Sequence, residues 1–254
     1  MRNRKRIVIP LPAGIRALGV SIIPMLIWLC WMQGAGWTTK AFAQEPPPLP
    51  PPDIGVFDIL ADGKRVGTER FEIRASESGW VVAGELQLQA PGGDKMTETS
   101  SLTLNSSLYP TYYERTQKSP RSGKLTVQFS PNETLLEMTA SEGDPYQQIF
   151  YLPRNDLAVL DTNFFHQFTL LLRLYNHERG MAQPLNVFIP QEALPGIVNL
   201  QYIARENVPS GETTVALDHF QAVTDELEME IWATPQGAIQ RISIPQASLE
   251  IVRQ

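Results

Sequence analysis

The sequence predicts a mainly β fold, with an antiparallel, strongly curved sheet or incomplete β-barrel wrapped around one apolar α-helix at about residues 164–178. Three observations support this fold class. Apolar and polar residues alternate along most of the chain. Turn-forming residues recur roughly every 10–12 residues, as in sandwiches and barrels. Only one long stretch has helical periodicity instead.

The chain begins with the three-part layout of a secretory signal. A basic start, Arg2 to Arg6, precedes an apolar stretch from about Leu18 to Trp37, and small residues Ala41 and Ala43 follow. This layout predicts a signal peptide over residues 1–43 with cleavage after Ala43. The alternative is an uncleaved anchor, because the apolar stretch approaches the roughly 20 residues that span a bilayer.

The cysteine content and the charge of the mature chain exclude several chemistries. Cys30 is the only cysteine, and Trp28 and Leu29 before it do not fit a lipoprotein signal. Cleavage would therefore remove the only thiol, and with it disulfides, thiol catalysis and cysteine metal sites. It would also leave 15 basic and 27 acidic residues, a formal charge of −12. Nucleic acid is then excluded as a partner, and membrane contact is expected only through an uncleaved N-terminal segment.

Two further segments complete the domain organisation. Prolines fill most of residues 44–53, and their fixed φ and missing amide donors predict a stiff polyproline II linker. Residues 54–254 then predict a single β-rich domain. In this domain Trp80, Val82 and Leu86 alternate with polar residues, and similar patterns recur in later segments. We expect one buried and one polar face on each strand.

The helical segment is too apolar for a helix on a flat sheet. On a wheel, its apolar residues cover about 220°, whereas one flat contact needs an arc a little over 100° wide. Asp161, Thr162 or Asn163 could cap its start, and Gly180 could end it. A curved sheet could wrap the helix as core, or part of the arc could face a ligand, partner or membrane. The candidate ligand-binding residues share this helix: Phe164, Phe165, Phe168, Leu172 and Tyr175, with Arg173 at the rim.

Three stretches resemble uncharacterised exported bacterial domains of unknown function, which are similar to half-barrel lipoprotein carriers of the cell envelope. They are the hairpin "FDILADGKRVGTERFEI", the helix with its preceding aspartate, "VLDTNFFHQFTLLLRL", and the strand pair "LEMEIWATPQGAIQRISI". The resemblance implies a domain in the periplasm or cell envelope of a Gram-negative-type bacterium, with a hydrophobic groove. It implies no reaction.

No motif predicts catalysis, a metal or a cofactor. His166 and His177 are too far apart along a helix, about 16 Å, to share an ion. The simplest interpretation of His219 is an inward or rim residue that shares a strand face with Val215 and Leu217. The simplest interpretation of the acidic run from Asp225 to Glu230 is a strand face exposed to solvent.

The leading hypothesis is therefore an exported, non-catalytic envelope protein. Its concave groove would bind a lipid or other amphiphile, or an envelope protein. The alternatives are an assembly module without a ligand and a hydrolase acting on cell-wall glycan or lipid.

Overall fold

The computed structural model describes residues 52–89, 95–119, 122–140, 144–210 and 213–254. These residues belong to one compact unit. The predicted signal peptide and the predicted linker, apart from Pro52 and Asp53, lie outside the described residues. Within the described ranges, no helix has both the length and the apolar character needed to cross a membrane.

The described residues form a single fifteen-stranded sheet with the order β8-β7-β6-β5-β4-β3-β2-β1-β15-β14-β13-β12-β11-β10-β9. Its first half contains β1 (Asp53–Ala61), β2 (Lys64–Ser76), β3 (Gly79–Gln89), β4 (Lys95–Asn105), β5 (Pro110–Ser119), β6 (Gly123–Phe129), β7 (Thr134–Ala140) and β8 (Tyr146–Phe150). Its second half contains β9 (Leu157–Val159), β10 (Gln183–Ile189), β11 (Leu194–Ser210), β12 (Thr213–Val223), β13 (Glu228–Ala233), β14 (Ile239–Ile244) and β15 (Leu249–Arg253).

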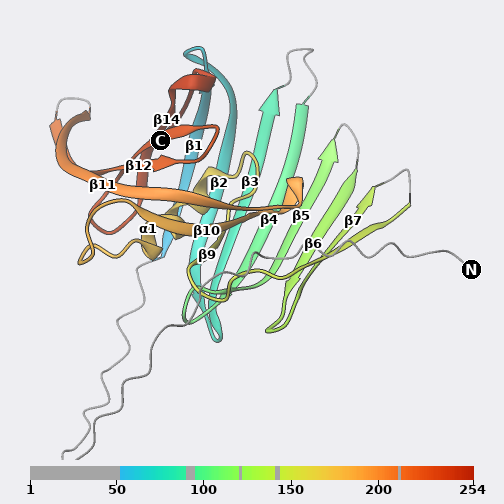
Figure 1. Cartoon of the computed structure of the whole chain (residues 1–254). Helices are drawn as coiled ribbons and strands as arrows, with labels where there is room; N and C mark the ends of the chain where they lie inside the picture. Colours follow the sequence, from blue (N-terminus) through green and yellow to red (C-terminus); the bar gives the residue numbers. More distant parts are fainter. Residues whose placement is uncertain (1–51, 90–94, 120–121, 141–143, 211–212) are drawn as a thin grey trace, which may run out of the picture. The chain divides into compact units, whose positions relative to one another are not determined.

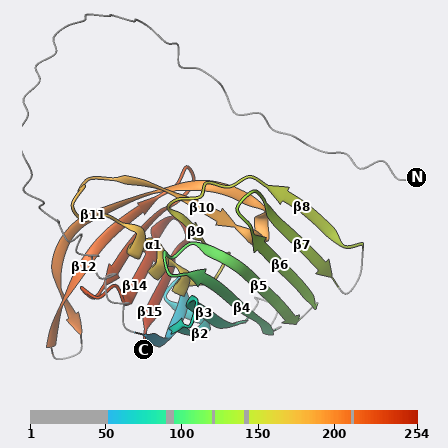
Figure 2. The same ribbon diagram turned by 90° about the horizontal axis from the view of Figure 1, so that it is seen from below.

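The sheet is antiparallel except for one pair and curls around the one α-helix of the described residues, which confirms the predicted fold class. The exception is β9 and β10, which run parallel because the helical segment connects them. Pairing of β1 with β15 joins the two halves. Figures 1 and 2 show these halves as two walls, with α1 between them.

The helical segment is shorter than the predicted range of about 164–178. A 3-10 turn, η1 (Phe165–Gln167), leads into α1 (Phe168–Leu174), and the extended backbone of Tyr175 ends the helix. Gly180 lies beyond this end, in the following turn, with φ 57°. The residue at the N-cap position of η1 is Phe164, which makes no side-chain capping hydrogen bond, so none of the predicted caps Asp161, Thr162 and Asn163 holds this position.

The two ends of the sheet overlap instead of pairing with each other. Consecutive residues are buried along β9, and Val187 and Phe188 are both buried in β10, so both faces of these strands are covered. The ring of Phe188 meets Phe129 of β6 and Phe150 of β8, with centroids 6.3 and 4.9 Å apart. The β6–β8 wall therefore packs against β10 and covers the interior.

Two strand connections use the same short sequence pattern. The 3-10 turns η2 (Pro190–Glu192) and η3 (Pro245–Ala247) both start with Pro-Gln, and an isoleucine precedes each of them. A leucine starts the next strand in both cases. Each turn ends with a left-handed residue, Ala193 at φ 52° and Ser248 at φ 49°. Their environments differ, because η2 contributes a buried proline and η3 no buried residue.

The core follows the predicted alternation closely. Trp80, Val82 and Leu86 are buried on β3, and Met229 and Ile231 are buried on β13. For His219 the inward alternative was wrong: Phe220 and Ala222 point inward on β12, so His219 lies on the other face, with Trp232 opposite it, and is 14% exposed.

Candidate functional site

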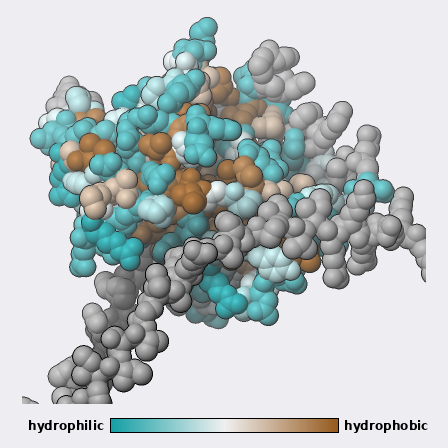
Figure 3. All heavy atoms as spheres, viewed as in Figure 1, coloured by the Kyte–Doolittle hydropathy of each residue, from teal (hydrophilic) through white to brown (hydrophobic). Residues whose placement is uncertain are grey.

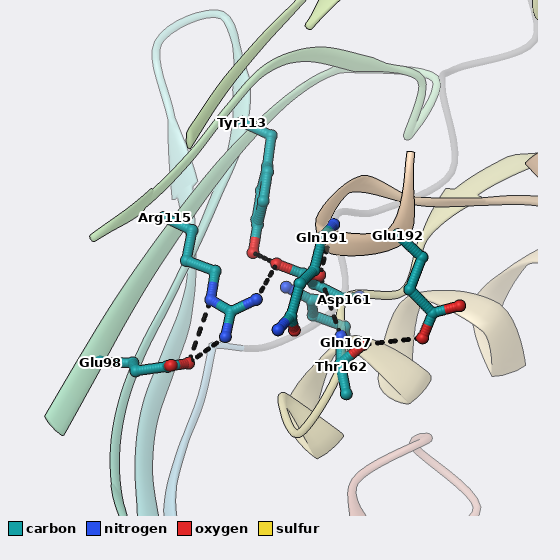
Figure 4. Close-up of polar contacts among 8 residues, drawn as sticks. All are labelled: Glu98, Tyr113, Arg115, Asp161, Thr162, Gln167, Gln191 and Glu192. Carbon is teal, nitrogen blue, oxygen red and sulfur yellow. Dashed lines mark hydrogen bonds and ion pairs between the residues drawn. The ribbon is translucent and has the colours of Figure 1, made fainter. Parts of the chain in front are cut away.

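A buried polar cluster surrounds Asp161, immediately before η1. Tyr113 of β5 donates its hydroxyl hydrogen to Oδ2 of Asp161 over 2.6 Å. The other carboxylate oxygen accepts the backbone N–H groups of Thr162 and Gln191, each at 3.0 Å. The backbone N–H of Asp161 itself donates to the side chain of Gln167 at 2.6 Å. Figure 4 shows how these contacts tie the η2 turn and the helical segment to the β5 wall.

Arg115 extends this cluster across the sheet. Its guanidinium donates to Glu98 of β4, with Nε 3.0 Å from Oε2, and its Nη1 lies 3.5 Å from Asp161. All three side chains are almost completely buried. One cation therefore lies between two carboxylates in a low-dielectric interior, where removing a partner is far more damaging than at the surface.

The same burial affects Tyr113. Loss of contact with water raises the pKa of its hydroxyl well above the ordinary value of 10.0, and the neighbouring Asp161 carboxylate raises this pKa further. The hydroxyl consequently remains protonated and donates to Asp161. Tyr113 acts here as a fixed donor.

A second buried pair holds the other side of the helical segment. Glu69 of β2 accepts from Nδ1 of His166 and, at 3.0 Å, from the backbone N–H of Phe165. Because a carboxylate only accepts, Nδ1 of His166 carries the hydrogen. Both side chains are fully buried. The first part of the predicted polar arc, His166 and Thr169, is thus enclosed, whereas Asn176 and His177 at its other end are exposed.

Gly84 on β3 makes room for this pair. A Cβ at that position would lie 2.5 Å from Cε1 of His166 and 3.3 Å from Phe164. Real Cβ atoms do not approach a ring so closely, so a larger residue would push the helical segment away from the sheet. The glycine therefore determines how deeply the segment is seated.

The candidate ligand-binding residues fall into two groups. Phe164, Phe165, Leu172 and Tyr175 are buried in the hydrophobic core. Phe168 and Arg173 are partly exposed. The structure brings the six onto one segment, and the four buried residues pack against the interior of the curled sheet.

Arg173 lies over the ring of the buried Trp80, with Cζ 5.3 Å from the ring centroid. Burial lowers the pKa of its guanidinium, whereas the charge of Asp53 raises it. Asp53 is itself paired with Arg253 at 2.5 Å. The surroundings of Arg173 are therefore a cation–π contact with Trp80 and the more distant charge of Asp53.

A pocket of about 410 Å³ opens at the C-terminal end of α1. Its apolar wall includes Leu174, Met181 and Leu185, and its charged groups are Arg179 and Asp156. This volume lies within the roughly 300–1,000 Å³ typical of small-molecule sites. None of the buried cluster residues described above lines it.

Hydrogen bonds hold the wall of this pocket in place. The side chain of Gln183 accepts from the backbone N–H of Asn176 at 3.0 Å and donates to the carbonyl of Asn176 at 2.7 Å. The hydroxyl of Tyr175 donates to the carbonyl of Met181 at 3.0 Å. The loop after α1 is therefore ordered from both ends, and the pocket is preformed.

The outer face carries a contrasting cluster around His219. Its two ring nitrogens lie 2.9 Å from Glu206 and 2.6 Å from Glu230, and its ring stacks on Trp232. The indole N–H of Trp232 also donates to Glu206 at 3.1 Å. This hydrogen bond, followed by that of His219, lowers the pKa of Glu206.

The acidic run from Asp225 to Glu230 lies beside the outer cluster. Glu226 and Glu228 of the acidic run are exposed, and Glu230 is bound to His219, so none of these acids lines the pocket at the end of α1. Across the described ranges, no group of three or more histidine, cysteine or acidic residues is arranged to hold a metal ion.

Comparison with known proteins supports the fold and leaves the activity open. No protein-family model matches the chain, and no curated protein matches it. A solved β-barrel-like protein of the domain of unknown function DUF1849, from Brucella abortus, is similar with a TM-score of 0.53 and 7% identity. The similarity covers 80% of this chain and 94% of that one.

A second solved structure, a DUF1089 family protein from Pseudomonas aeruginosa, has a TM-score of 0.40 and 11% identity over 70% of this chain and 90% of that one. The neighbours are thus domains of unknown function. The fold that the DUF1849 structure supports is β-barrel-like, in agreement with the curled sheet.

Proposed function

We propose that the protein is an exported, non-catalytic binding domain of the cell envelope of a Gram-negative-type bacterium. In this proposal it binds an amphiphile in the pocket at the end of α1. The signal-like layout of residues 1–43 supports export. The observation that carries the binding proposal is the preformed pocket of about 410 Å³, with an apolar wall and one charge of each sign in the described lining.

The chemistry of the lining favours an amphiphile with a zwitterionic head. Leu174 and Met181 offer apolar surface to a short hydrocarbon segment. Arg179 could pair with an anionic group of the head, and Asp156 with a cationic group. A head of one charge sign would meet repulsion from one of these two residues.

The proposal places the ligand at the end of the helix and not along it. Phe164 and Leu171 are at most 1% exposed, and the buried pairs of His166 and Arg115 close the space on both sides of the segment. A ligand along the helix would have to displace these contacts. At the end of α1, by contrast, Met181 is 80% exposed and available for contact.

Binding of dodecylphosphocholine below its critical micelle concentration tests the proposal. We expect isothermal titration calorimetry of the mature chain to show saturable binding with one site. Met181→Glu and Arg179→Glu should each weaken it by roughly tenfold or more, which corresponds to about 1.4 kcal/mol. Leu227→Glu is the matched control, because Leu227 is an exposed apolar residue in a different part of the sheet.

The same variants define the results that would contradict the proposal. Absence of saturable binding, or equal weakening by Leu227→Glu, would contradict an amphiphile site at the end of α1. Dodecyl maltoside provides the comparison for the head group, since it is uncharged. Equal affinity for both amphiphiles would show that Arg179 and Asp156 do not select a zwitterionic head.

A further inference from the structure

The two edges of the sheet are protected very differently. At one edge, the three residues of β9 are at most 3% exposed. At the other edge, β8 pairs with β7 on one side, and no described strand pairs with its other side. Tyr146 and Ile149 of β8 are 44% and 49% exposed, and the adjoining Tyr151 is 80% exposed. Figure 2 shows β8 at the end of the green strands.

Apart from its short length, the β8 strand itself lacks several features by which proteins usually prevent edge pairing. Its sequence, YQQIF, contains no charged residue and no proline. Its five residues pair with β7 in continuous register, without a bulge. Edge strands are normally blunted by lysine, proline, bulges or a covering segment, because their free N–H and C=O groups template the addition of another strand.

We propose that β8 is a self-association edge, at which a second copy of this chain adds its own β8 antiparallel to form a two-fold symmetric dimer. The proposal is independent of amphiphile binding. In such a pair, residues on the same face of each strand meet across the axis. With all five residues of β8 paired about Gln148, Ile149 would lie opposite Gln147 of the other copy and diagonal to its counterpart Ile149, at about 7–8 Å on the outer face.

Charge is the observation that favours a second copy as the occupant. The described chain is acidic overall, and any charged residue on a self-pairing strand would meet its own like charge nearby. β8 has none. The nearest acidic side chain on the adjacent strand is Glu137, which accepts a hydrogen bond from Gln147 at 2.5 Å. Two β7 strands would be separated by three strand spacings, about 14 Å, which is more than a Debye length at physiological salt.

The proline-rich segment of the chain is a poor alternative occupant. Residues 46–48 and 50–52 are prolines, which cannot donate a backbone hydrogen bond to a strand edge. A short edge also bounds the strength of the dimer. Five paired residues bury less area than the roughly 1,200 Å² of a stable interface. We therefore expect a weak, concentration-dependent dimer.

Complementary charge variants test self-pairing. Sedimentation velocity of the mature chain from micromolar to millimolar concentration should show a monomer–dimer equilibrium. Ile149→Lys and Ile149→Glu should each shift the dimer dissociation constant upward by tenfold or more. An equimolar mixture of the two should recover dimerisation, because opposite charges then meet across the axis. Ile197→Lys is the control, since Ile197 is 56% exposed on β11.

The results distinguish self-association from other occupants. A chain that remains monomeric at millimolar concentration would overturn the proposal. So would a dimer that Ile149→Lys and Ile197→Lys weaken equally, or a failure of the mixture to recover dimerisation. Circular dichroism of each variant checks that the exposed substitution leaves the fold intact. Amphiphile titration of the Ile149 variants should be unchanged, which separates this proposal from the pocket.

Discussion

The inner and outer clusters of the curled sheet use the same kinds of residues in opposite environments. Inside, Arg115 lies between Glu98 and Asp161, and all three are nearly inaccessible to water. Outside, His219 lies between Glu206 and Glu230, of which Glu206 is 41% exposed. The difference teaches that position, and not residue type, decides the energetic consequence of an ion pair. Removing one partner of a buried pair therefore strongly destabilises the packing of the helix, whereas exposed pairs are weakened by water and salt.

Arg115→Met gives the largest expected effect in this comparison. The substitution would leave Glu98 and Asp161 buried without their cation, so we expect a loss of about 3–5 kcal/mol in the free energy of unfolding. Urea denaturation measures it. Arg241→Met is the outer control, because Arg241 pairs with the exposed Glu250 and should cost no more than about 1 kcal/mol. Equal losses for the two variants would remove the distinction.

Gly84→Ala tests how tightly the inner cluster is seated. The new Cβ would lie 2.5 Å from His166, so we expect a loss of about 1–3 kcal/mol from overpacking. Gly123→Ala is the matched control in another strand, since its nearest neighbour would lie 3.6 Å away. The free energy of unfolding is measured by thermal or urea denaturation. Equal losses for the two variants would show that the helical segment can move away from β3 without strain.

The pH dependence of protein stability tests the contribution of Tyr113 to the inner cluster. Its pKa is raised in the folded state, so its contribution to stability is complete below the ordinary pKa of 10.0 and is lost as pH rises above that value. Tyr113→Phe should lower stability at pH 8 by about 1–3 kcal/mol, because Asp161 loses a buried donor. It should also flatten the loss of stability between pH 9 and 11 (about one unit on each side of that pKa). Tyr151→Phe, at an exposed site, should retain the wild-type slope.

Glu230→Gln gives the smallest expected effect and completes the comparison. The substitution removes one partly exposed charge beside His219 but retains the shape of the side chain, so we expect a change below about 1 kcal/mol. This change should shrink further in 0.5 M salt (roughly a 4 Å Debye length). Urea denaturation at low and high salt measures it. A loss as large as that of Arg115→Met would mean that the outer cluster also supports the fold.

Sequence periodicity was sufficient to predict the strands, because the core positions recur with the strand period of two, and the wide apolar arc of the helical segment predicted the curl of the sheet. The same periodicity contained a signal for the inner cluster. Glu69 falls on the face of Phe71 and Ile73, and Arg115 falls on the face of Tyr113. A charged residue at an inward position requires a partner in the interior. Reading these positions as inward would have predicted buried ion pairs.

Other features depend on long-range geometry that periodicity does not contain. The pairing of Glu69 with His166 joins residues 97 positions apart. The pocket at the end of α1 depends on where Tyr175 turns to extended backbone and on the loop that Gln183 then holds. The unequal protection of β8 and β9 follows from the overlap of the sheet ends, which only the folded arrangement reveals.

Hydrogen–deuterium exchange with and without dodecylphosphocholine tests the central claim most directly. That claim is a helical segment sealed inside the sheet, with ligand access at its C-terminal end. Peptides spanning residues 164–172 should exchange only through global unfolding in both conditions, whereas peptides spanning 174–185 should gain protection when the amphiphile binds. Fast exchange of residues 164–172 in the free protein, or ligand protection along that stretch, would contradict the account.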